Sequence, residues 1–128
     1  MHKGCSGRCR TLLYVSNLWK EGMSVFQAGD AAQGELLQRK ALALLAELSG
    51  FPVVEAKIRN NLGVILSCSG RDTEARWEFV QALTLLSGRV EPGTRFHQVI
   101  ANNYAQTMVR RALPAAADAE AARLAIAS

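Results

Sequence analysis

Residue types that could perform catalysis are few in this sequence, and they stand apart from one another. His97 has no Asp or Glu three or four residues away that could orient its imidazole. The segment 67–69, Ser-Cys-Ser, lacks the G-x-S-x-G pattern of a nucleophile elbow. Gly70 is not part of a G-x-x-x-x-G-K-S/T phosphate-binding loop. These residues therefore indicate no nucleophile, general base or phosphate site.

Glu74 and Glu78 are the carboxylates whose spacing comes nearest to a pair, because residues four apart share a helix face. Arg71 and Arg76 stand beside them, so we interpret the group as an ion-paired, solvated surface. The sequence predicts a protein that is not an enzyme and needs no cofactor.

His2, Cys5 and Cys9 are residue types that bind zinc. A closed structural zinc site needs four ligands, and no fourth stands near these three, so no metal site is predicted. Together with Cys68 the cysteines are odd in number and do not form a disulfide framework. Residues 1–10, rich in glycine and basic side chains, are predicted to be a disordered basic tail.

Two pairs of asparagines carry the remaining chemistry, which is recognition. The pair Asn60-Asn61 returns 42 residues later as Asn102-Asn103. An asparagine amide offers both a donor and an acceptor, so it can pair with the C=O and N–H of a peptide backbone. The alternative is that Asn61 and Asn103 bond to neighbouring helix ends within the protein.

Residues 60–85 contain the pattern that positions these asparagines. Apolar residues recur at helical spacing up to Gly70, which is expected to end a first helix. Asp72 or Thr73 is expected to cap a second helix, since a short side-chain oxygen satisfies the free N–H groups of a first turn.

Small residues recur where these two helices would cross. In the second helix Ala75, Phe79 and Ala82 fall three or four residues apart, so they share one face. Gly63 is the small residue of the first helix. We therefore predict an antiparallel hairpin in which Gly63 and Ala75 allow the helices to approach closely.

Landmarks of this hairpin recur at one offset along the chain, the sign of an internal repeat. Residues 41 positions earlier, or 41–42 positions later, repeat its glycines and alanines: Gly22 and Gly63, Gly29 and Gly70, Ala41-Leu42 and Ala82-Leu83, Gly63 and Ala105, Ala75 and Ala117, Leu83 and Leu124. The sequence thus predicts three copies of one hairpin.

Turn signals divide the chain into six expected helices and no strand. Gly29-Asp30, Gly50-Phe51-Pro52 and Gly88–Gly93 mark turns, and Thr94 is a natural cap for the helix after it. The expected helices cover 12–28, 31–49, 53–69, 72–87, 95–112 and 115–127.

The Leu-Gly pair, turn Gly, Ala, aromatic and Ala of the central hairpin resemble a tetratricopeptide repeat (TPR). The long period and the strings Asn-Asn-Leu-Gly and Asn-Asn-Tyr-Ala are similar to the kinesin light chain type. The resemblance covers residues 15–127 and is weaker where Gly34 and Gln38 replace the Ala and the aromatic. It implies an all-α fold of three antiparallel helical hairpins stacked as a right-handed superhelix. The repeats would cover 15–55, 56–97 and 98–128 of a single domain, 11–128.

In arrays of this family the first helix of each repeat lines a concave groove that binds peptides. The resemblance therefore implies a non-enzymatic scaffold that binds a peptide segment of a partner protein. The positions it assigns to the groove are Trp19, Lys20, Met23, Lys57, Asn60, Asn61, Val64, Asn102, Asn103, Gln106 and Arg110. The carboxylate clamp that some members use is not expected, because only Asn61 fits its residue pattern.

Two other functions stay open. A short array leaves two open ends, so the chain could instead be a structural module that self-associates through its terminal helices. It could also be a fragment or relative of bacterial peptide-sensing regulators built from similar long repeats.

The net charge of +4 is placed unevenly, because Lys3, Arg8 and Arg10 carry +3 of it. Residues 11–128 carry twelve basic and eleven acidic side chains, which argues against a nucleic-acid partner. Lys57 and Arg110 favour an acidic peptide. No apolar run is long enough for a signal sequence or a membrane span, so a soluble cytoplasmic protein is expected.

Overall fold

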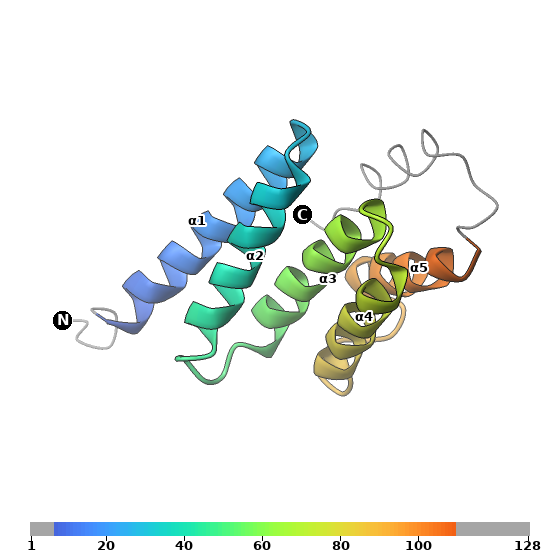
Figure 1. The fold of residues 1–128 in the computed structure, drawn as a ribbon. Coiled ribbons are helices and arrows are strands. Elements are labelled where there is room, and N and C mark those ends of the chain that lie inside the picture. The colour runs from blue at the N-terminus through green and yellow to red at the C-terminus, as the bar shows by residue number, and fades with distance from the viewer. Residues whose placement is uncertain (1–6, 110–128) are drawn as a thin grey trace. The chain divides into compact units, whose positions relative to one another are not determined.

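The computed structural model describes residues 7–109, and this part of the chain is all helical, as predicted (Figure 1). No residue between 7 and 109 belongs to a strand. Five helices follow one another: α1 (Arg8–Gln27), α2 (Ala31–Leu45), α3 (Pro52–Cys68), α4 (Asp72–Leu86) and α5 (Arg95–Val109). The sixth expected helix, 115–127, lies outside the described residues.

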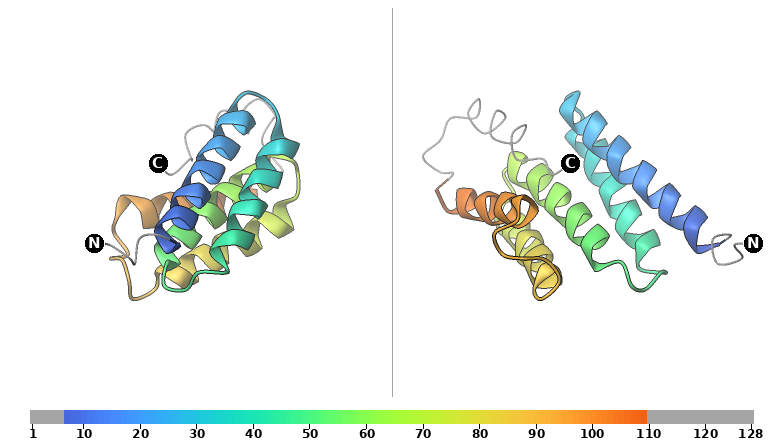
Figure 2. Two further views of the ribbon diagram at one scale, coloured as in Figure 1. Left: turned by 90° about the vertical axis from the view of Figure 1, so that its left-hand side faces the viewer. Right: turned by 180° about the vertical axis from the view of Figure 1, so that it is seen from behind.

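The chain forms two compact units, Met1–Phe51 and Pro52–Ser128, where a single domain over 11–128 was expected. The first unit contains the hairpin α1–α2, and the second contains the hairpin α3–α4 with α5. In both hairpins the two helices run side by side and are joined by a tight turn (Figures 1 and 2).

The turn inside each hairpin is built in the same way, at two glycines that lie 41 residues apart. Gly29 has φ 108° and Gly70 has φ 80°, a left-handed conformation that glycine adopts without steric cost. The N–H of Asp30 donates to the carbonyl of Val25, and the N–H of Arg71 donates to that of Leu66, both at 2.9 Å. These are equivalent bonds of a Schellman motif, which ends a helix by satisfying its last carbonyls.

Small residues lie at the helix crossings, but the partner of Gly63 differs from the expected one. A Cβ on Gly63 would lie 2.5–2.9 Å from three ring carbons of Phe79, so the ring occupies the space that glycine leaves. The equivalent Gly22 faces Gln38, whose Nε2 would lie 2.7 Å from such a Cβ. Gln38 is fully buried, and its Nε2 donates to the backbone carbonyl of Trp19 at 2.8 Å.

Helix α1 begins four residues earlier than expected, so the predicted disordered tail is wrong for residues 8–10. Arg8 explains this start. Its Nη2 donates to the carbonyl of Ser49 at 2.7 Å, and its guanidinium lies 5.3 Å from the ring centroid of Phe51. The partners that order the start of the helix are thus more than 40 residues away in the sequence.

The predicted caps have mixed outcomes. Thr94 caps α5, because its Oγ1 accepts from the N–H of His97 at 3.3 Å. Asp72 and Thr73 do not cap α4, which starts at Asp72 after Arg71 and has no side-chain cap bond. Asp72 instead lies in the first turn, where a negative charge favours the helix dipole.

Asp30 is the N-cap of α2, and replacing it should weaken the first unit. Its Oδ1 accepts from the N–H of Gln33 at 3.0 Å, and an alanine cannot accept this bond. We expect Asp30→Ala to lower the free energy of unfolding by about 1 kcal/mol, the usual cost of losing a cap. Urea titration followed by circular dichroism would measure the change. The control Glu47→Ala removes an exposed carboxylate with no cap bond, and an equal loss there would contradict the assignment.

Candidate interaction surface on helices α3 and α5

Side-chain contacts join α3 to α5 in the second unit. The Nζ of Lys57 lies 5.7 Å from the ring centroid of Phe96, within reach of a cation–π interaction. One turn further along α3, Asn103 Nδ2 donates to Asn60 Oδ1 at 2.9 Å in a buried position. The buried residues of α5, Ile100, Asn103 and Thr107, fall three or four apart and so share one face.

Several residues assigned to the groove are buried, so the expectation that they line an open surface is wrong. Asn60 and Asn61 are 0% exposed, Val64 is 3% exposed, and Met23 and Asn103 are each 5% exposed. The reason for Asn60 and Asn103 is their bond to each other, which no local pattern shows. That bond favours the structural alternative for this pair of asparagines.

The other residues assigned to the groove are accessible, except Arg110, which lies outside the described residues. Lys20 and Asn102 are exposed, and Trp19, Lys57 and Gln106 are half-buried. Trp19 and Lys20 belong to the first unit, where the Lys20 Nζ lies 5.7 Å from the Trp19 ring centroid. Arg110 lies outside the described residues.

The structure therefore leaves only part of the predicted site accessible. Lys57 of α3 and Asn102 and Gln106 of α5 are its accessible members in the second unit. We call these three residues the α3–α5 face. It presents one ammonium group and two carboxamides, which can hold a carboxylate and backbone amides by hydrogen bonds.

Asn61 is a buried amide of a different kind. Within residues 7–109, neither its Oδ1 nor its Nδ2 has a hydrogen-bond partner, and the same is true of Asn60 Nδ2. A buried polar group without a partner costs about 1–3 kcal/mol. Asn61 therefore does not contribute an accessible amide.

An ion-paired cluster lies on the hairpin α3–α4. The sequence predicted that Glu78 is ion-paired, but it did not predict Arg59 as its partner. Arg59 Nη1 lies 2.9 Å from Glu78 Oε1, and its Nε lies 2.9 Å from Glu55 Oε2. Its guanidinium also lies 5.5 Å from the ring centroid of Trp77, which is 54% exposed. The prediction that Glu78 belongs to a solvated surface is wrong, because its side chain is only 8% exposed.

Burial acts to lower the pKa of Arg59, but the hydrogen bonds and charges of its two partners act the other way. Glu55 and Glu78 together outweigh the burial, and the pKa of Arg59 lies above its usual value. The guanidinium is therefore held in its charged form and links the two helices.

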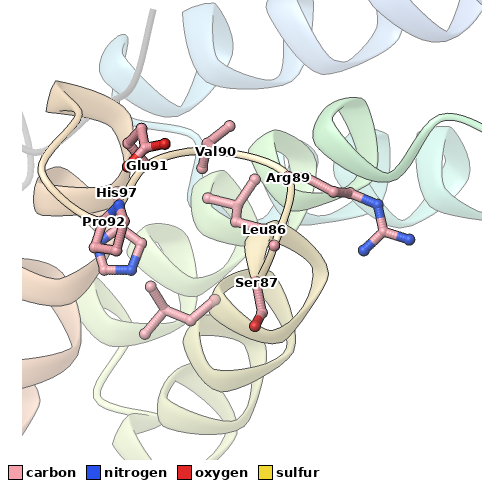
Figure 3. A pocket seen from close by; sticks show the side chains of 9 residues that line it. Leu86, Ser87, Arg89, Val90, Glu91, Pro92 and His97 are labelled. Atoms are coloured by element: carbon pink, nitrogen blue, oxygen red, sulfur yellow. The ribbon is translucent and has the colours of Figure 1, made fainter.

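A pocket of about 600 Å³ lies where α4 ends and α5 begins (Figure 3). It is lined by Leu83, Leu86, Ser87, Gly88, Arg89, Val90, Glu91, Pro92 and His97. Figure 3 shows Arg89 leading away from His97 and Pro92, and its Nη1 donates to the Leu85 carbonyl at 3.0 Å. The pocket lining therefore mixes polar and apolar groups, with Ser87, Glu91 and His97 among the polar ones.

Residues 7–109 contain no group of three His, Cys, Asp or Glu side chains close enough together to hold a metal ion. Cys9 is exposed and forms no disulfide, whereas His2 and Cys5 lie outside the description. None of the five helices is both long and apolar enough to cross a membrane.

The chain matches no protein-family model, and no curated protein or solved structure matches it either.

Proposed function

We propose that this protein is a non-enzymatic interaction module that binds a peptide segment of another protein on the α3–α5 face. The observation that carries the proposal is the accessibility of Lys57, Asn102 and Gln106 beside a buried Asn60–Asn103 bond. That bond fixes the two helices to each other, so the face is held in one geometry before a ligand arrives. Preorganisation of this kind lowers the entropic cost of binding.

The expected ligand is an acidic peptide with an extended backbone. Lys57 is the cation of the face, and its ammonium can donate to an Asp or Glu side chain. Asn102 and Gln106 lie four residues apart on α5, so they project from the same side of the helix. Each carboxamide can pair with one C=O and one N–H of the peptide.

The resemblance to tetratricopeptide repeats supports the same function. Equivalent glycine turns 41 residues apart and the small residues at both helix crossings are features that such repeats share. Under this proposal the region 115–127 completes a third hairpin with α5, the hairpins stack as a right-handed superhelix, and the protein acts in the cytoplasm.

The test is a peptide-display selection against the intact chain, followed by fluorescence polarisation with one enriched peptide. We expect enrichment of Asp and Glu, and a Kd about tenfold higher for the double variant Asn102→Ala, Gln106→Ala. Two uncharged hydrogen bonds of about 0.5–1.5 kcal/mol each account for that factor. Asn61 and Asn103 are not suitable targets, because both are buried.

Gln33→Ala is the matched control, since Gln33 is an exposed carboxamide of α2 and is not part of the defined face. Lys57→Gln should reduce the preference for acidic peptides while leaving circular dichroism unchanged. Equal losses for Gln33→Ala and the double variant, or selected peptides without acidic residues, would overturn the proposal.

A further inference from the structure

The repeat offsets relate α1 to α5 position by position. Offsets of 41 and then 42 residues carry four positions of α1 onto four of α5: Leu13 onto Phe96, Asn17 onto Ile100, Lys20 onto Asn103, and Ser24 onto Thr107. Phe96 and Asn103 are the α5 residues that contact α3, through Lys57 and Asn60. The four equivalent side chains of α1 are all exposed, and Leu13 is 63% exposed.

Three of these four positions keep the chemistry of the α5 residue. Leu13 is apolar like Phe96, and Ser24 carries a hydroxyl like Thr107. Lys20 is a hydrogen-bond donor at the position of Asn103, whose Nδ2 is the donor in the bond to Asn60. Helix α1 therefore presents, on an exposed face, an apolar side chain and a hydrogen-bond donor at the two positions through which α5 contacts α3.

The same offset defines what α5 offers on its own accessible side. A shift of 42 carries Lys57, Asn60 and Val64 of α3 onto Val99, Asn102 and Gln106 of α5. Asn102 is thus the equivalent of Asn60, the acceptor of the buried bond, and it is exposed. Gln106 of α5 holds the position equivalent to Val64 of α3, and Asn17 of α1 holds the position equivalent to Ile100 of α5. At both positions an amide therefore stands where the buried α3–α5 pair has an apolar residue.

We propose that a second copy of this chain docks on α5 through its α1, so that copies associate head to tail. Lys20 of one copy donates from Nζ to Asn102 Oδ1 of the next, and Leu13 packs on Val99. The contact repeats between copies the arrangement that α5 and α3 show within one chain. Such a contact joins two different surfaces, so it leaves a free α1 at one end and a free α5 at the other.

The proposed self-association does not depend on peptide binding, but it would compete with it. Asn102 and Gln106 belong to both surfaces, so a docked copy and a bound peptide would exclude each other. Self-association is measured on the protein alone, and its failure would leave the peptide proposal standing.

The test measures molar mass by light scattering over a range of concentrations of the intact chain. The wild-type mass should rise with concentration, whereas Lys20→Ala and Asn102→Lys should each associate at least tenfold more weakly, because each removes the hydrogen bond between the copies. A mixture of these two variants should form a 1:1 dimer and nothing larger, because it contains one intact α1 and one intact α5. Asn102→Asp should strengthen association about tenfold, since its carboxylate forms a charge-assisted bond with Lys20.

Lys40→Ala is the control for the loss of a lysine, because Lys40 is an exposed lysine of α2 and is not part of the interface. Circular dichroism verifies that every variant is folded. A wild-type chain that stays monomeric at all concentrations overturns the proposal. So does a mixture of the two variants that stays monomeric, or equal effects of Lys40→Ala and Lys20→Ala.

Discussion

A chain with Ala in place of Phe79 is expected to lose about 3–5 kcal/mol of its free energy of unfolding. Phe79 is 1% exposed, and its ring fills the space above Gly63 at the crossing of α3 and α4. Removing the ring forfeits the transfer free energy of a large apolar side chain and leaves a cavity between two helices. Urea titration followed by circular dichroism would measure the loss.

The same crossing supplies a sharper form of this prediction. Gly63→Ala should cost about 1–3 kcal/mol by overpacking, because the new methyl group would lie 2.5 Å from a carbon of the Phe79 ring. In the double variant the methyl group of Gly63→Ala enters the cavity left by Phe79→Ala. The double variant should therefore lose less free energy of unfolding than the sum of the losses of the two single variants. Gly93→Ala is the control, since a Cβ there would meet nothing within 4 Å. Additive losses would show that Gly63 and Phe79 do not pack as described.

Arg59→Met is expected to be the second large loss, at about 2–3 kcal/mol. Its side chain is 20% exposed and that of Glu78 is 8% exposed, so the substitution removes the cation from a mostly buried carboxylate. Breaking a fully buried pair costs about 3–5 kcal/mol, and the partial exposure of Arg59 places the expected value lower. Thermal unfolding of the variant and the wild type at one salt concentration would measure it.

The matched control is Arg39→Met. Arg39 Nε lies 2.9 Å from Glu35 Oε2 four residues earlier, the geometry and distance that Arg59 shares with Glu55. The Arg39 side chain is 44% exposed, so its loss should cost only about 0.3–0.5 kcal/mol. Arg59→Met combined with Glu78→Leu should recover most of the loss, because no buried carboxylate is then left without its cation. Equal losses of stability for Arg59→Met and Arg39→Met would show that the loss comes from the pair with the glutamate four residues earlier, and not from Glu78.

The raised pKa of Arg59 also sets the pH range over which its contribution holds. A group whose pKa is higher in the folded protein contributes its full stability below the unfolded pKa, and loses it as the pH rises through the folded pKa. For arginine both values lie far above neutrality. The difference between Arg59→Met and wild type should therefore not change through loss of the arginine charge between about pH 6 and 8.

The sequence by itself determined the helices and the turns that join the two helices of each hairpin. Both depend on interactions within a few residues of the chain. Apolar residues three or four apart share a helix face, and only glycine enters the left-handed conformation at Gly29 and Gly70 without cost. For this reason the five described helices start or end within four residues of their expected bounds, and the offset of 41 reappears in matching hydrogen bonds.

The sequence also placed Lys57 and the asparagine pairs on neighbouring helices, but it did not tell which of them are accessible. Asn60 and Asn102 hold equivalent positions, yet Asn60 is fully buried and Asn102 is exposed. The difference is that Asn60 has the donor Asn103 beside it, 43 residues away in the chain. Likewise Arg8 starts α1 because Ser49 and Phe51 lie next to it. Only the tertiary structure decides such contacts, because the partners lie more than 40 residues apart in the chain and no local spacing encodes them.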